Sequence, residues 1–142
     1  MRRRNPPPAD PPEFFTDRGL GLRVVAALRG EGWIIHPMQE VYPSSDRGRR
    51  ERFQDENWIP TVTENGWVIL AKDGFRFEHE RRAIVECGAR VFSIPRANLR
   101  SEHMAERFFA SQDAIFGHCR NNGPFMYSVH PTTIQPVTLP NA

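Results

Sequence analysis

Two strongly apolar segments of this chain end at or just before an acidic residue, and this pattern constrains the fold more than any other feature. Phe14-Phe15-Thr16 leads directly into Asp17, and Val68-Ile69-Leu70-Ala71 leads through Lys72 into Asp73. Short continuous apolar runs are typical of strands that are buried on both faces, as in a parallel sheet. Because helix-like patterns alternate with these strands, we predict an α/β domain with a mostly parallel sheet.

The other segments extend this alternation along the chain. Strands are predicted at 13–16, 33–36, 67–71, 90–94, 125–129 and 133–137, and helices near 20–28, 55–65, 78–87 and 101–116. The last two strands are separated by a Pro-containing turn, which predicts a hairpin at the sheet edge. Residues 37–54 are rich in Pro, Ser, Gly and Arg, and are therefore predicted to form the longest internal loop.

One domain is expected over residues 13–137. The chain has 142 residues and is 39% hydrophobic, which is enough for a single core. Residues 1–12 contain five prolines and three arginines and are expected to remain a disordered or draped arm, with 138–142 as a C-terminal tail. The sequence lacks a signal peptide and the ~18 apolar residues needed to span a bilayer, so we expect a cytoplasmic protein with no membrane partner.

The acidic residues gather where parallel sheets bind ligands, beyond the carboxyl ends of the strands. Asp17 and Asp73 follow two strands, and Asp55 and Glu56 begin the helix between them. Carboxylates held close together repel one another unless a divalent cation compensates them, and an all-oxygen ligand set favours Mg²⁺ or Mn²⁺. Such a site can activate water against a phosphodiester, which predicts hydrolysis of a nucleic acid. Helix capping and the helix dipole are alternative explanations for Asp55 and Glu56.

Basic residues near these acids are candidates for phosphate or RNA binding. The net charge of +2 does not by itself require a polyanionic partner. Arg18 and Arg76 are the preferred pair because a guanidinium can bind phosphate through two hydrogen bonds, and Lys72 lies beside Asp73. The group also includes Arg49 and Arg50 from an arginine-rich stretch, for which an ordinary solvated loop is the alternative.

Three segments resemble the short PIN-like domains of VapC-type toxins from bacterial toxin-antitoxin pairs. They are Phe14-Phe15-Thr16-Asp17-Arg18-Gly19-Leu20-Gly21, Asp55-Glu56-Asn57-Trp58-Ile59-Pro60 and Val68-Ile69-Leu70-Ala71-Lys72-Asp73. With weaker likeness elsewhere, the resemblance covers roughly residues 13–137. It implies a three-layer α/β/α sandwich, an Mg²⁺- or Mn²⁺-dependent ribonuclease activity on RNA and a cognate antitoxin, and it leaves a homodimer open.

The resemblance also implies roles for individual acids. Asp17 corresponds to the first metal-binding acid, Asp55 or Glu56 to the helix acid, and Asp73 to the acid after the central strand. Larger PIN nucleases offer a further acid, for which this sequence provides only candidates without a supporting motif: Glu78, Glu80 and Asp113.

Two other functions remain as alternatives. One is a PIN-like module that binds RNA or protein without catalysis, which would explain why the further acid is missing. A phosphoacceptor receiver-like domain would also have acids after these strands, but it needs a second acid beside the first and a lysine after a late strand. Phe14-Phe15-Thr16 and Val91-Phe92-Ser93-Ile94-Pro95 supply neither of these.

Overall fold

The computed structural model describes residues 11–43, 55–95 and 98–141, with side chains from residue 58 onward in the second range. Most of the predicted N-terminal arm lies outside the described residues, as do Arg49 and Arg50. No helix within the described ranges is long and apolar enough to cross a bilayer.

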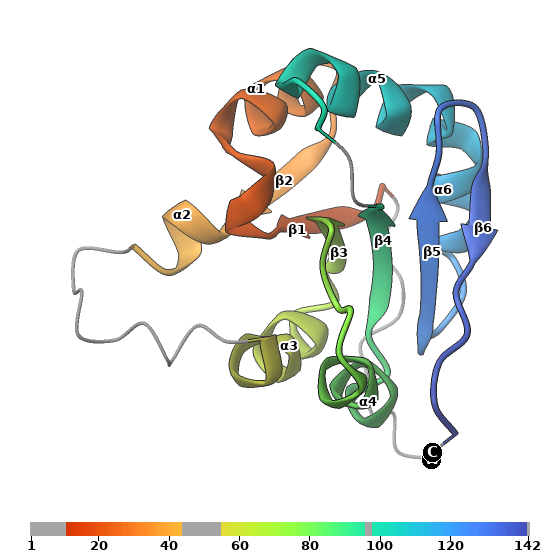
Figure 1. Ribbon diagram of the computed structural model, residues 1–142. Helices are drawn as coiled ribbons and strands as arrows, with labels where there is room; N and C mark the ends of the chain where they lie inside the picture. The colour runs from red at the N-terminus through yellow and green to blue at the C-terminus, as the bar shows by residue number, and fades with distance from the viewer. Residues whose placement is uncertain (1–10, 44–54, 96–97, 142) are drawn as a thin grey trace.

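A six-stranded sheet forms the centre of the molecule (Figure 1). Its strands are β1 (Glu13–Thr16), β2 (Ile34–Pro37), β3 (Val68–Lys72), β4 (Arg90–Ile94), β5 (Phe125–Val129) and β6 (Ile134–Pro136). The spatial order is β2-β1-β3-β4-β5-β6, in which the first five strands are parallel and β6 runs antiparallel to β5. The predictions of a mostly parallel sheet and of a terminal edge hairpin are therefore confirmed.

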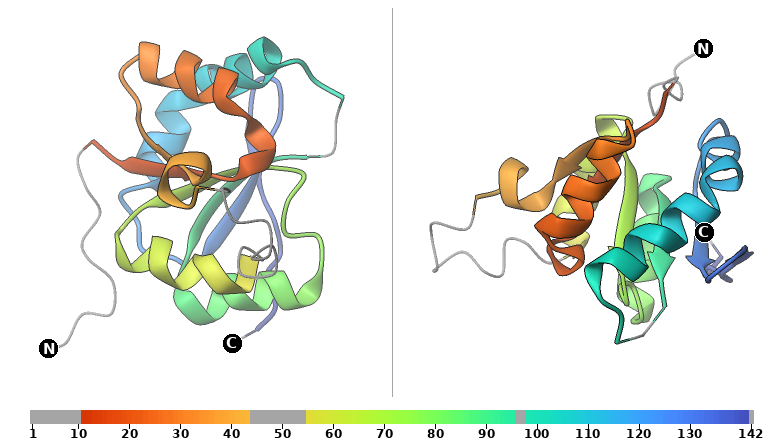
Figure 2. Two further views of the ribbon diagram at one scale, coloured as in Figure 1. Left: turned by 90° about the vertical axis from the view of Figure 1, so that its left-hand side faces the viewer. Right: turned by 90° about the horizontal axis from the view of Figure 1, so that it is seen from above.

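Helices cover both faces of this sheet. They are the short 3-10 helix η1 (Arg18–Leu20) and the α-helices α1 (Leu22–Gly30), α2 (Met38–Val41), α3 (Asp55–Glu64), α4 (Glu78–Cys87), α5 (Ser101–Ala110) and α6 (Gln112–His118). Figures 1 and 2 show α1 and α5 on one side of the sheet and α3 and α4 on the other. The fold is the predicted three-layer α/β/α sandwich.

Alternation of side chains along the strands produces two cores. Phe14 of β1 packs with Leu28 of α1 and Phe108 of α5 on one face. Phe15, the next residue, packs on the other face with Trp58 of α3 and other residues from α3 and α4. Both faces of the central strands are thus covered, which explains why these strands are apolar throughout.

Two sequence predictions about local structure are wrong. The single helix expected over 101–116 is broken at Ser111 into α5 and α6, and Phe108 of α5 and Ile115 of α6 both lie in the first core. The segment expected to begin as a loop after Pro37 instead starts with helix α2, because Met38 is buried against the second core. Neither feature follows from local periodicity, since packing decides both.

Candidate active site

Asp17 and Asp73 lie on either side of the point where the sheet changes direction. The chain leaves β1 toward β2 on one side and leaves β3 toward β4 on the other, while β1 and β3 are neighbours. In open parallel sheets, ligands bind at such a switch point, beyond the carboxyl ends of the strands. The backbone N–H of Asp17 donates to Leu70 O at 3.0 Å, and that of Asp73 donates to Ile94 O at 2.7 Å. Both acids are therefore fixed at this edge of the sheet, as the sequence predicted.

The Asp17 carboxylate is held in a partly enclosed position. Its Oδ1 accepts a hydrogen bond from Gly19 N at 3.3 Å, which caps η1. Its Oδ2 faces Gly74, where a Cβ atom would lie 3.8 Å away. Burial raises the pKa of Asp17 above its usual value; the charge of Glu80 adds to this, while backbone hydrogen bonds and Arg18 act against it. A nearby positive charge would stabilise the ionised form of this carboxylate.

Asp73 stands at the start of an unusual turn. The φ angles of Asp73 and Phe75 are 52° and 63°, in the left-handed region that non-glycine residues rarely adopt. The turn is held by Arg81, whose Nε donates to Phe75 O at 2.6 Å, and by a long contact from Gly74 N to Ser93 Oγ at 3.5 Å. Strained backbone of this kind concentrates at functional sites, where the surrounding contacts maintain it.

Of the three candidates for a further acid, Glu80 is the one near the site. It lies in the first turn of α4, and its Oε1 accepts a hydrogen bond from Phe77 N at 3.2 Å. The charge of Glu80 also contributes to the raised pKa of Asp17. Glu78 is exposed and pairs with Arg82 at 2.8 Å. Asp113 belongs to α6, which packs in the core on the opposite face from α4. Sequence spacing could not distinguish these residues because the direction of α4 depends on its packing.

The helix acids are located by their backbone alone. Asp55 and Glu56 are the first two residues of α3, as predicted, and α3 packs beside α4. Their side chains lie outside the part that the structure describes, so their roles stay predictions. Among the side chains it does describe, no group of three or more His, Cys, Asp or Glu is arranged to hold a metal ion.

The predicted phosphate-binding residues have different surroundings. An Nη of Arg18 donates to Tyr42 O at 2.9 Å, a contact that connects η1 to the end of α2. Arg76 is exposed, lies over the Phe77 ring at 5.8 Å and lines a pocket that begins at Asp73. Lys72 ends β3 and is the single lysine of the chain.

Sequence reasoning missed two serines beside this edge. Ser93 and Ser128 are paired neighbours on β4 and β5, and both line the same pocket as Asp73. A signal existed for Ser93, since it is a polar residue between the apolar Phe92 and Ile94 of a predicted strand. Ser128 carried no comparable signal, because only the register between β4 and β5 brings it to the site.

Comparisons with known proteins agree with this architecture. The model of a family described as PIN like domain matches residues 12–96. Over 129 residues, the chain is 38% identical to a Mycobacterium tuberculosis protein named "Putative ribonuclease VapC45", covering 89% of this chain and 91% of that protein. No solved structure matches the chain significantly. The chain therefore belongs to the PIN-like domain family, and within it to the VapC-type group.

Proposed function

We propose that this protein is a metal-dependent endoribonuclease that acts as the toxin of a type II toxin-antitoxin pair. The main observation in support is the position of Asp17 and Asp73 on either side of the sheet's switch point. The similarity to a protein named as a VapC ribonuclease supports RNA as the substrate.

The residues at this edge fit a divalent cation. Asp17 is a half-buried carboxylate whose pKa is raised by burial and by Glu80, so a nearby positive charge would stabilise its ionised form. The available donors are carboxylate oxygens, which favour Mg²⁺ or Mn²⁺. Asp17, Asp73 and the helix acids Asp55 and Glu56 would hold the ion. When bound, it supplies Lewis-acid chemistry by activating water and offsetting charge on the phosphodiester.

The chain's own groups have separate tasks in this proposal. Oδ1 of Asp17 accepts a hydrogen bond from the Gly19 N–H, and Oδ2 would be the oxygen more available to a cation. Glu80 accepts a hydrogen bond from Phe77 N through Oε1, and its Oε2 would accept one from the attacking water. Arg76, at the rim of the pocket beside Asp73, neutralises the phosphate.

The direct test is cleavage of a mixed RNA pool by purified protein with Mg²⁺ or Mn²⁺, and with EDTA. Asp17→Asn and Asp73→Asn should abolish cleavage, while Asp113→Asn, an exposed acid on α6, should retain it. If the folded wild-type protein binds RNA but leaves it intact with either metal, the non-catalytic binding module replaces this proposal.

The toxin role is tested in cells. Expression of the chain alone in the cytoplasm should arrest growth, and expression of the Asp73→Asn variant should not. Co-expression of a cognate antitoxin should restore growth and yield a complex that copurifies with this chain. Normal growth with active protein would contradict the toxin role and leave the nuclease in place.

A further inference from the structure

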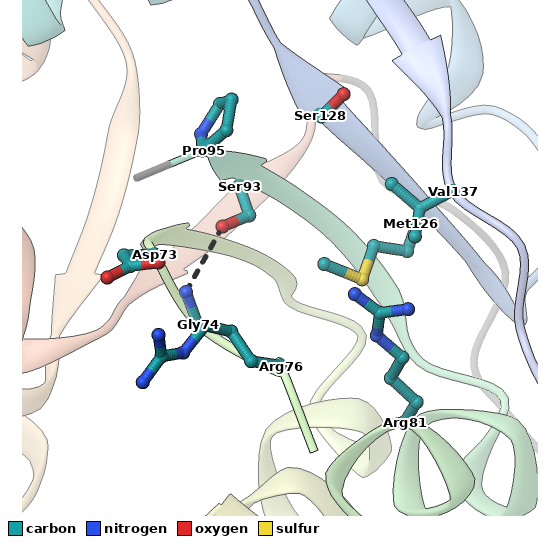
Figure 3. Close-up of a pocket in the computed structure, with 9 residues that line it drawn as sticks. All are labelled: Asp73, Gly74, Arg76, Arg81, Ser93, Pro95, Met126, Ser128 and Val137. Carbon is teal, nitrogen blue, oxygen red and sulfur yellow. Dashed lines mark hydrogen bonds between the residues drawn. The ribbon is translucent and has the colours of Figure 1, made fainter. Parts of the chain in front are cut away.

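A pocket of about 330 Å³ opens directly beside the acidic edge (Figure 3). Asp73 and Gly74 form one end of it, at the turn after β3. Ser93 of β4 and Met126 of β5 form the sheet side, and Arg81 of α4 closes it from the helix layer. A ligand in this pocket would therefore touch the residues that surround Asp73.

The lining combines three kinds of chemistry that match one nucleotide. Met126 and Val137 offer apolar surface for the face of a base, and Ser93 offers a hydroxyl for its edge. Arg76, whose guanidinium lies on the Asp73 side in Figure 3, is suited to the adjoining phosphate. The volume is near the lower end of the ~300–1,000 Å³ typical of ligand pockets, which suits one unpaired nucleotide rather than a duplex.

Arg81 gives the pocket a fixed set of hydrogen-bond donors. Its Nε is used by Phe75 O at 2.6 Å, which holds the side chain in place. Figure 3 shows its guanidinium turned toward Met126, inside the pocket. Among the described residues, no carboxylate pairs with its two Nη atoms, whereas the neighbouring Arg82 pairs with Glu78 at 2.8 Å. Within the described part of the chain, the Nη atoms of Arg81 are therefore available to donate to a ligand.

We propose that this pocket binds one nucleotide of single-stranded RNA next to the scissile phosphate, with guanosine preferred. The base packs on Met126 and Val137, and the Nη atoms of Arg81 donate to its edge. Guanine suits this donor pair because O6 and N7 are adjacent acceptors, while adenine presents an amino donor beside N7. The pocket thereby selects the cleavage position. This inference rests on the proposed ribonuclease function for its role but makes a binding prediction of its own.

The test measures binding of ribonucleoside 5′-monophosphates by calorimetry in EDTA, so that no cleavage is needed. GMP should bind, and AMP should bind about tenfold more weakly, the difference expected for one charge-assisted hydrogen bond. Val137→Phe, which fills the pocket, and Arg81→Ala should each weaken GMP binding by about tenfold or more. Arg82→Ala is the matched control on the same helix and should bind GMP like the wild type.

A second readout keeps the inference separate from folding and from catalysis. Sequencing of cleavage ends should show guanosine beside the cut for wild type and a relaxed preference for Val137→Phe, with folding of each variant checked by circular dichroism. Ser93→Ala, a smaller change, should also relax the preference. If RNA is cut but GMP and AMP bind equally, or if the preference survives in all pocket variants, the pocket assignment is overturned. If GMP binds as predicted but RNA stays intact, the ribonuclease proposal fails and the pocket stands.

Discussion

Gly74 lies directly against the carboxylate of Asp17, so that a methyl group on its Cα would be 3.8 Å from Oδ2. The two residues come from different parts of the chain and meet because β1 and β3 are neighbours. Gly74 has no positive φ, and the other close atom, Ala71 Cβ, would be at an ordinary contact distance of 3.5 Å. The glycine therefore keeps space open beside the carboxylate without being required by the backbone.

This relationship predicts that Gly74→Ala separates folding from activity. The free energy of unfolding should change by less than about 1 kcal/mol, because the methyl group fits. RNA cleavage should fall by roughly ten- to a hundredfold, since the methyl group crowds the coordinating side of Asp17. Thermal melts and cleavage assays on the same preparation would check both. Full activity in Gly74→Ala would show that Oδ2 of Asp17 takes no part in metal binding or catalysis.

Asp17→Asn is expected to stabilise the metal-free protein at neutral pH. Burial raises the folded-state pKa of Asp17 above its unfolded value. Ionisation of Asp17 then opposes folding. The contribution of Asp17 to the free energy of unfolding is greatest below its unfolded-state pKa, and it falls as the pH rises through its folded-state pKa. Asn keeps an oxygen for the Gly19 N–H and has no charge to bury. Melting temperatures in EDTA from about pH 4 to about pH 8 should therefore decline less steeply for the variant.

Added metal should reverse this order of stability. A metal concentration of 100 times the Kd would stabilise the wild type by about 2.7 kcal/mol, and Asp17→Asn by much less. Equal stabilisation of both proteins would mean that the cation binds elsewhere.

Glu80 and Glu78 provide a matched pair on helix α4. Glu80→Gln should reduce cleavage by about a hundredfold, as expected for the loss of a group that orients water. Glu78→Gln should leave cleavage unchanged, because Glu78 is exposed and its partner is Arg82. Rates measured at saturating Mg²⁺ would distinguish the loss of water orientation in Glu80→Gln from weaker metal binding. A similar loss in both variants would point to the N-terminus of α4 as a structural requirement instead.

Arg90 is predicted to stabilise the sheet at the amino-terminal end of β4, opposite the carboxyl ends where Asp17 and Asp73 lie. Its side chain is 8% exposed and donates to Cys119 O at 2.6 Å and to Gly66 O at 2.8 Å, which joins the end of α6 to the turn before β3. Arg90→Met should lower the free energy of unfolding by about 2–5 kcal/mol, because both carbonyls lose a charged donor. Arg90→Lys can satisfy one carbonyl and should lose less. Urea unfolding would measure both, and a Met variant as stable as wild type would contradict the assignment.

Gly123 and Gly117 should respond in opposite ways to alanine. A Cβ atom on Gly123 would overlap backbone atoms of Gly88 and Ala89, at 2.2 Å from Gly88 O, so Gly123→Ala should cost about 3 kcal/mol or more. Gly117 lies within α6 and its Cβ would meet no atom within 4 Å. Gly117→Ala should gain about 0.5–1 kcal/mol from helix propensity. Denaturant midpoints would reveal the contrast, and equal effects would show that the contact at Gly88 relaxes without strain.

The sequence by itself determined the strands and the placement of two acids, Asp17 and Asp73, after them. Apolar runs such as Val68 to Ala71 predict buried strands because the signal is local and strong. The carboxyl ends of parallel strands share one edge, so the ends of these runs are enough to place Asp17 and Asp73 at the same edge of the sheet. The start of α3 at Asp55 followed from helix-start preferences, which are also local.

Only the tertiary structure decided which other side chains join that edge. Glu80 was indistinguishable from Glu78 in sequence, and the packing direction of α4 separates them. Ser93 and Ser128 meet because β4 and β5 pair in one particular register, which no short segment specifies. The pocket that Arg81 lines likewise exists only once helix, turn and sheet have packed. Local sequence sets where each strand ends, and packing between distant segments sets what those ends face.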